Sequence, residues 1–174
     1  GVYGQRYTAS GAQSGGEFRV NTYTTLDQYY PAVAALTDGS FVVTWMSDGQ
    51  DGNGAGVYGQ RYTASGAQRG GEFRVNSYTT SDQSHPAVAA LSDGGFVVTW
   101  TSNGQDGDAG GVYGQRYTAS GAQTGGEFRV NSYTTSYKFD SAVAALTDGG
   151  FVVTWTSNNG GLDGDSYYGV YVRS

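Results

Sequence analysis

The stretch "PAVAALTDGSFVVTW" (Pro31–Trp45) decides the fold, because it has the pattern of two short β-strands joined by a tight turn. "PAVAAL" and "FVVTW" are apolar runs of strand length, and the Asp-Gly between them supplies the positive φ angles that a tight hairpin needs. The hairpin returns with small changes at 86–100 and 141–155. The chain is therefore predicted to be built from repeated β-hairpins.

Outward from this hairpin, the flanking sequence repeats as well. "GVYGQRYTASGA" starts at Gly1, Gly56 and Gly111, and "GEFRV" follows each copy after a glycine-rich turn. These segments predict two more strands per unit. The predicted repeats are 1–55, 56–110 and 111–168, and "GVYVRS" (169–174) opens a fourth.

Four antiparallel strands in a unit of this length are typical of a propeller blade, although a β-trefoil or a stacked β-sandwich array also uses short, evenly spaced strands. The alanines of "PAVAAL" favour the propeller, since small side chains suit strands that crowd a central axis. The bulkier Phe, Val and Trp of "FVVTW" would fill the wider space between blades. We therefore expect an all-β, propeller-like chain.

The composition narrows the classes of partner. With 15 acidic and 9 basic residues the net charge is −6, which disfavours binding to nucleic acid or to an anionic membrane. No apolar run has membrane-spanning length, so no membrane insertion is expected. The chain contains no cysteine, which excludes disulfides and thiolate metal sites.

The ordered set "DGGFVVTW", a Gly/Asp loop, "GVYGQRY" and "GEFRVN" resembles tandem repeats of very large secreted bacterial proteins of the RTX or "calcium-binding" type, some of them adhesin-like. The resemblance covers nearly the whole chain and implies an extracellular or cell-surface β-repeat module. It implies no catalytic activity. The glycine- and aspartate-rich nonapeptide array of those proteins is absent, so calcium binding is not inherited from the resemblance.

Differences between the copies gather in two loops, as in binding proteins that carry variable loops on a rigid scaffold; unconstrained drift is the alternative. One loop precedes each "AVAAL" strand, and its aromatic and acidic side chains are the candidates for glycan contact. They are Tyr29, Tyr30, Tyr137, Phe139, Asp27 and Asp82.

The other variable loop follows each "FVVTW" strand and offers oxygen ligands between glycines, which suits calcium. These candidate ligands are Asp48, Asp51, Asn53, Asp106, Asp108, Asp163 and Asp165. Plain turn formation is the alternative, because Asp and Asn beside Gly are common in turns and the spacing is not that of an EF-hand. Calcium is thus a possible cofactor, and no cofactor is certain.

Three further features have a structural explanation. Trp45, Trp100 and Trp155 could stack on sugars but are in phase with buried strand positions, so core packing is favoured. The Glu-Phe-Arg motif of each copy, with Glu17 the first such acid, predicts ion pairs on a sheet face. His85 has no counterpart in the other copies and is interpreted as a solvated loop residue.

Almost every polar group occurs in triplicate, whereas an enzyme gathers dissimilar groups in one pocket. The predicted function is therefore a non-enzymatic, structural or adhesive repeat module that self-associates; the alternative is a multivalent, lectin-like carbohydrate-binding propeller. The sequence contains four predicted strands that begin Gly-Val-Tyr, but only three copies of each of the other predicted strands. We expect the terminal strands to pair with another copy, for instance as two chains in a six-bladed ring, or with neighbouring repeats of a longer chain.

Overall fold

The computed structural model describes residues 1–158 and 168–173, and these form β-strands joined by turns and loops. In this part of the chain no helix is long and apolar enough to cross a membrane. The strands are β1 (Tyr3–Gly4), β2 (Phe18–Arg19), β3 (Gln28–Ala35), β4 (Phe41–Asp48), β5 (Ala55–Tyr62), β6 (Phe73–Arg74), β7 (Gln83–Ala90), β8 (Phe96–Asn103), β9 (Gly110–Tyr117), β10 (Gln123–Arg129), β11 (Lys138–Ala145), β12 (Phe151–Ser157) and β13 (Gly169–Arg173).

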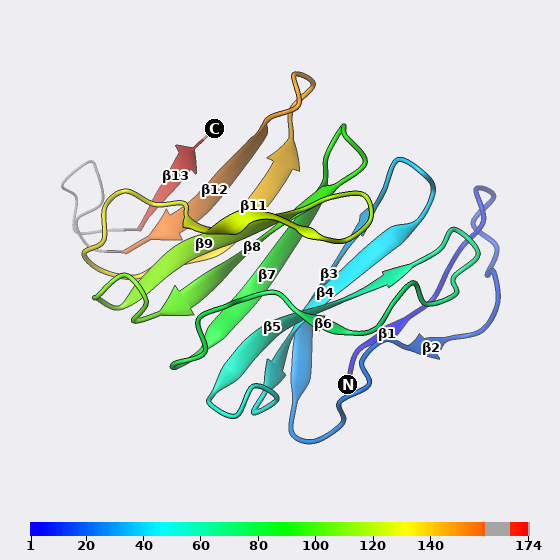
Figure 1. Cartoon of the computed structure of the whole chain (residues 1–174), viewed down its shortest axis with the longest axis horizontal. Coiled ribbons are helices and arrows are strands. Elements are labelled where there is room, and N and C mark those ends of the chain that lie inside the picture. Colours follow the sequence, from blue (N-terminus) through cyan, green and yellow to red (C-terminus); the bar gives the residue numbers. More distant parts are fainter. Residues whose placement is uncertain (159–167, 174) are drawn as a thin grey trace.

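The strands form separate antiparallel sheets that fan out one beside the next (Figure 1). Two sheets have four strands, in the orders β3-β4-β5-β6 and β7-β8-β9-β10. The first sheet contains only β1-β2, and the last contains β11-β12-β13. We call β3-β4, β7-β8 and β11-β12 the inner hairpins, and β1-β2, β5-β6 and β9-β10 the outer pairs.

Each inner hairpin is closed by the predicted Asp-Gly turn. In the first hairpin the Leu36 amide donates to the Ser40 carbonyl at 2.7 Å, and Gly39 has a φ of 79°. The Asp38 carboxylate accepts the Ser40 amide at 3.0 Å. The turn is fixed by local chemistry, since positive φ suits glycine and an Asp side chain readily caps a nearby amide.

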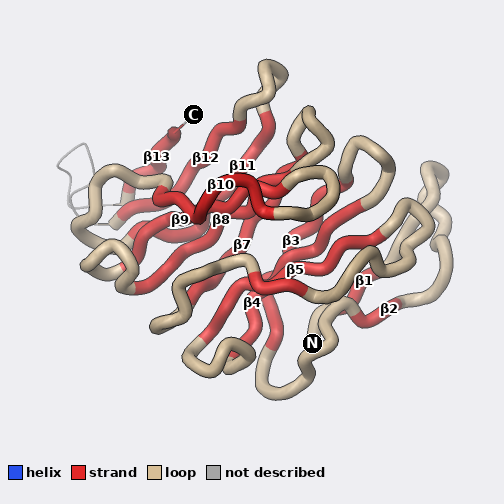
Figure 2. Tube along the Cα trace, in the orientation of Figure 1, coloured by secondary structure: helices blue, strands red, loops and turns tan. Residues whose placement is uncertain are grey.

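The first strands of the inner hairpins lie against one another, with β7 in contact with both β3 and β11 (Figure 2). Small alanines at these positions let the strands approach closely, as predicted. The propeller-like architecture is confirmed, and the β-trefoil and stacked-sandwich alternatives were wrong because each sheet is a four-stranded meander or part of one. Each complete sheet also combines parts of two sequence repeats. The sheet β3-β6, for instance, begins at Gln28 in the repeat 1–55 and ends at Arg74 in the repeat 56–110.

The core lies between neighbouring sheets. Trp45 and Trp100 are fully buried and Trp155 is 8% exposed, which confirms the packing interpretation. At the central boundary Trp100 of β8 packs with Val42 and Val57 of the preceding sheet. Aromatic contacts add to the boundaries, for instance Phe73 of β6 against Tyr117 of β9 with ring centroids 5.4 Å apart. Each sheet thus buries its large side chains against its neighbour, as propeller blades do.

Polar contacts tie the outer pairs to the preceding sheets. The Glu72 carboxylate accepts the Thr22 amide at 2.7 Å and the Thr22 hydroxyl at 2.8 Å, and Glu127 makes the same two contacts with Ser77. The predicted Glu-Arg ion pairs were therefore wrong for these two copies. The carboxylates instead satisfy backbone and hydroxyl donors across a sheet boundary, which is a stronger use of a charge than an exposed ion pair.

Candidate functional site

Each of β3, β7 and β11 carries a β-bulge near its start, where the pairing register shifts. The bulged residues are Tyr30, His85 and Asp140, and their φ angles are 52°, 51° and 51°. A non-glycine residue held at positive φ costs roughly 1–3 kcal/mol. The same strained backbone recurs three times, yet the side chain differs each time. A bulge re-aims a side chain, so this position deserves a functional explanation.

The three bulges open onto one cavity of about 280 Å³. Its lining residues come from the three innermost strands and are Tyr30, Pro31, His85, Pro86, Asp140 and Ser141. The Tyr30 and His85 rings stack with centroids 4.1 Å apart, and His85 Nε2 lies 3.9 Å from Asp140 Oδ1. We call Tyr30, His85 and Asp140 the axial trio.

The axial trio remains accessible: Tyr30 is 48% exposed, and the side chains of His85 and Asp140 are 39% and 58% exposed. His85 is therefore not the lone loop residue expected from the sequence. It contacts an aromatic ring on one side and a carboxylate on the other, because neighbouring inner strands bring the three copies of one position together. An aromatic face, a ring nitrogen and a carboxylate can together stack on and hydrogen-bond a polar ligand.

Two of the predicted glycan residues lie in a second cavity, of about 380 Å³, at the edge of the sheet β3-β6. Tyr29 and Asp82 line it together with Asp48, one of the predicted calcium ligands. The Tyr29 hydroxyl donates to Asp48 at 3.3 Å, and burial, with the nearby Asp48 charge, raises the pKa of Tyr29. Asp82 accepts the Ala55 amide at 3.0 Å, which links two sheets and gives it a structural role.

The remaining glycan candidates lie elsewhere. The Tyr137 and Phe139 rings contact each other with centroids 5.6 Å apart. Tyr137 also covers Gly110 so closely that a Cβ there would lie 2.7 Å from the ring. Asp27 is exposed, and its carbonyl accepts the Asp48 amide at 2.9 Å. The structure therefore brings only Tyr30 of the predicted residues to the central cavity.

Two of the predicted calcium ligands, Asp51 and Asp106, cap turns in the structure. Asp51 accepts the Asn53 amide at 3.1 Å and Asp106 accepts the Asp108 amide at 3.4 Å, both within a turn. Asp108 accepts the Ser136 amide at 2.9 Å, from the loop before β11. Within residues 1–158 and 168–173, no three His, Cys, Asp or Glu side chains gather to hold a metal ion. Asp106 belongs to the second of these loops, and Asp163 and Asp165 lie outside the described residues. Calcium binding by these loops stays a prediction.

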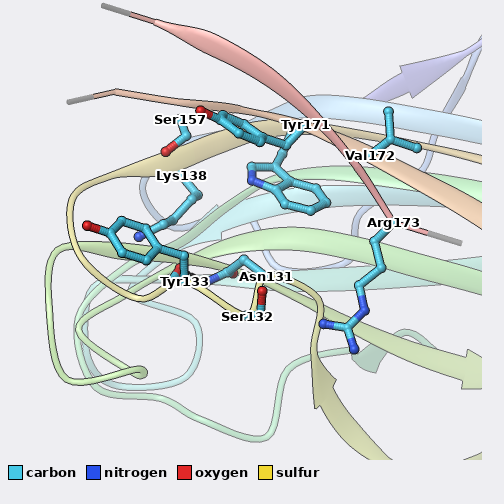
Figure 3. Close-up of a pocket in the computed structure, with 9 residues that line it drawn as sticks. Asn131, Ser132, Tyr133, Lys138, Ser157, Tyr171, Val172 and Arg173 are labelled. Atoms are coloured by element: carbon cyan, nitrogen blue, oxygen red, sulfur yellow. Dashed lines mark hydrogen bonds between the residues drawn. The ribbon is translucent and has the colours of Figure 1, made fainter. Parts of the chain in front are cut away.

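A third cavity, of about 280 Å³, lies between the loop after β10 and the last sheet (Figure 3). Lys138 lies beside it, almost fully buried, and its ammonium donates to the carbonyls of Thr135 and Ser136. Burial lowers the pKa of Lys138. The corresponding residues of the other sheets are Gln28 and Gln83, so the copies differ in chemistry here as well.

Comparison with solved structures shows the same fold in glycoside hydrolases. An endo-arabinase from Bacteroides thetaiotaomicron is 13% identical with a TM-score of 0.56, over 95% of this chain and 62% of that one. An α-L-arabinofuranosidase from Lactobacillus brevis is 10% identical with a TM-score of 0.57, over 93% and 55%. A Penicillium chrysogenum α-L-arabinanase complexed with arabinobiose is 19% identical with a TM-score of 0.52, over 92% and 46%.

These identities establish a shared fold and nothing finer. The chain spans about half to three-fifths of the length of the solved structures that it matches. No family model and no curated protein matches the sequence. The resemblance to RTX-type secreted repeats therefore receives no support from these comparisons.

Proposed function

We propose that this chain is a carbohydrate-binding β-propeller module whose ligand site is the axial trio. The observation that carries the proposal is the convergence of Tyr30, His85 and Asp140 in one accessible cavity. The same backbone conformation recurs at this point in all three copies, whereas the side chain that it carries is an aromatic ring, an imidazole and a carboxylate in turn. Dissimilar groups in one cavity are what a binding site requires, and a purely structural position would not need them.

The chemistry of the trio suits a sugar. Tyr30 offers an aromatic ring to the apolar C–H face of a pyranose or furanose. Asp140 can accept hydrogen bonds from two neighbouring hydroxyls, and His85 can donate or accept one more. Support from the comparisons is indirect: the similar solved structures include arabinan-degrading enzymes, one of them complexed with arabinobiose. Arabinan and xylan oligosaccharides are therefore the first ligands to test.

The same site argues for binding without hydrolysis. Glycoside hydrolysis ordinarily uses two carboxyl groups that flank the scissile bond. Asp140 is the only acidic residue among the described residues that line this cavity. We therefore propose a binder and no enzyme, and we place it outside the cell or at its surface, where polysaccharides occur. This site is single and asymmetric, unlike the multivalent arrangement that was the alternative prediction from the sequence.

The test is titration calorimetry with arabinan and xylan oligosaccharides, with and without chelator, backed by a broad glycan array. Asp140→Asn and Tyr30→Ala should each weaken binding by roughly tenfold or more, because each removes a direct contact. Asp27→Asn is the matched control, since it removes an exposed carboxylate outside the cavity and should leave binding unchanged. Absence of binding to every glycan would refute the proposal, and release of reducing sugar abolished by Asp140→Asn would show an enzyme instead.

A self-associating repeat module remains a second candidate function. The specific observation in its favour is exposed apolar surface at both ends of the sheet array: a groove beside β1-β2 at one end, and Leu146, Val170 and Val172 at the other.

A further inference from the structure

The first and last sheets are both incomplete, and each contains the pair of strands that the other lacks. The first sheet is an outer pair, β1-β2, without an inner hairpin. The last sheet is an inner hairpin, β11-β12, followed by β13 alone among the described strands. The two chain ends marked in Figure 1 lie at opposite ends of the array. Within one chain these two incomplete sheets are separated by the two complete sheets.

A groove of about 560 Å³ runs beside β1-β2, in the place where an inner hairpin would lie. It is lined mainly by apolar residues of β1 to β4, among them Val33, which is 66% exposed. At the next sheet boundary the equivalent residue, Val88, is partly buried against a cluster that contains Leu36 and Val42. Those two residues belong to the inner hairpin of the preceding sheet. The groove therefore corresponds to a missing Leu and Val from such a hairpin.

The last inner hairpin carries these residues without a partner. Leu146, the counterpart of Leu36, is 37% exposed, whereas Leu36 and Leu91 are almost fully buried. Val152, the counterpart of Val42, is only partly buried. The hairpin β11-β12 thus presents the apolar groups that the groove beside β1-β2 lacks.

The strand β13 fills the place of an outer strand incompletely. In the complete sheets this strand carries Gly59 or Gly114, and a Cβ on Gly59 would lie 2.7 Å from the Phe73 ring that covers it. β13 has Val172 at this position, so a phenylalanine-bearing outer strand cannot cover it in the same way. Val170 and Val172 are 76% and 65% exposed. β1, in contrast, has the required glycine, Gly4, already covered by Phe18.

A polar contact is also left open at both ends. Thr22 and Ser77 each bind a glutamate of the following outer pair. Their counterpart Ser132 lines the cavity of Figure 3, and no carboxylate of the described residues hydrogen-bonds to it. Glu17 of the first outer pair is the matching glutamate, and it makes no such bond within the described chain. An outer pair from elsewhere would supply this carboxylate.

We propose that a second copy of this chain completes the sheet: β1-β2 of one copy takes the place of β13 beside β11-β12 of the other. Glu17 then binds Ser132, and Leu146 and Val152 enter the groove beside Val33. The exchange is reciprocal, so two complete sheets from each chain and two shared sheets close a two-fold ring of six. Six lies within the range of closed propellers, and a closed symmetric dimer leaves neither terminal sheet incomplete. The proposal is independent of carbohydrate binding.

Engineered disulfides test the shared sheet in the full chain, which has no native cysteine. In the sheet β3-β6, Met46 is opposite Val57, so the shared sheet places Thr156 opposite Val2 of the second copy. The double variant Val2→Cys/Thr156→Cys should oxidise to a covalent dimer on a non-reducing gel. In the single chain Thr156 is opposite Val170, so Thr156→Cys/Val170→Cys reports whether β13 keeps its place.

A Val2→Cys/Thr156→Cys protein that stays monomeric or forms a ladder overturns the proposal, as does complete intrachain closure of Thr156→Cys/Val170→Cys. Sedimentation equilibrium supplies a second measurement that does not depend on oxidation. Glu17→Ala should raise the dimer dissociation constant about tenfold or more, because a charged hydrogen bond is lost at two symmetric places. Arg69→Ala, which removes a surface ion pair with Asp38, is the matched control. An unchanged constant for Glu17→Ala contradicts the proposal.

Discussion

The strands β1 and β5 are formed by two copies of one sequence, "GVYGQRYTASGA", but they differ in structure. β5 pairs over Ala55–Tyr62 and is buried along its whole length, whereas β1 pairs only at Tyr3–Gly4. Tyr62 is 1% exposed and its counterpart Tyr7 is 61% exposed. Tyr58 and Tyr3 differ in the same way, at 6% and 65%.

The difference shows that local sequence does not fix burial in this fold. β5 pairs with β4 on one side and β6 on the other, while β1 pairs only with β2 and has no inner hairpin beside it. Strand formation here is therefore a property of sheet neighbours, as expected for a repeat architecture in which each unit buries its face against the next. Interior and terminal copies of one residue become natural pairs for mutagenesis.

The largest expected effect is at the central sheet boundary. Trp100→Ala should destabilise the fold by about 3–5 kcal/mol, because a fully buried indole leaves a large cavity. Trp155→Ala should cost less, since this residue lies at the last boundary and keeps 8% exposure. Urea unfolding followed by circular dichroism measures both. Equal losses would contradict a difference between interior and terminal sheets.

A tyrosine pair sharpens the comparison within one sequence motif. Tyr62→Ala should cost about 2–4 kcal/mol, because the ring is buried and stacks on Phe41 with centroids 4.8 Å apart. Tyr7→Ala should change the monomer by less than about 0.5 kcal/mol, as for other exposed sites. The unfolding free energies are compared at protein concentrations where the chain is monomeric. A large loss for Tyr7→Ala there would show that β1 is already covered.

Titration of a buried interior tyrosine gives an effect of intermediate size. Burial raises the pKa of Tyr117 to about 12, while the unfolded chain loses the same proton near pH 10. The resulting stabilisation is complete below pH 10 and is lost as the pH rises towards 12, by about 2–3 kcal/mol in all. Tyr117→Phe should flatten this loss when unfolding is measured from about pH 9 to about pH 11. The same alkaline loss in both proteins would rule Tyr117 out as its source.

The smallest expected effect restores the interior chemistry in the last sheet. Gln83 accepts a hydrogen bond from Asn76 at 2.9 Å and donates to the Thr80 carbonyl at 3.1 Å. Lys138→Gln should recover both bonds and remove a buried charge, with a gain of about 1 kcal/mol at pH 7. Because burial lowers the pKa of Lys138, the native chain gains stability as the pH rises towards the unfolded value, so the advantage should shrink there. Thermal melts at two pH values check both statements.

Much of the fold could be predicted because its signals are local. The Asp-Gly turn of Asp38 and Gly39, the alternation around Trp45 and the alanines of β3 each report their own strand or turn. The candidate site was less predictable. Tyr30 was identified as an exposed loop aromatic, but nothing in a single copy indicates that it meets His85 and Asp140. The sequence signal was weak, because these three residues occupy one position of a loop whose neighbouring positions also differ between the copies.

The sequence by itself determined the turns and the segments able to form strands, since hydrophobic alternation and turn chemistry act over a few neighbouring residues. Only the tertiary structure decided which copies of a residue are buried, and which side chains share a cavity. Both depend on contacts between sheets whose inner strands lie 55 positions apart in the chain, as His85 lies from Tyr30. Such contacts form only when the sheets pack around a common centre, and that packing brings three bulged residues together and leaves Tyr3 and Leu146 exposed at opposite ends.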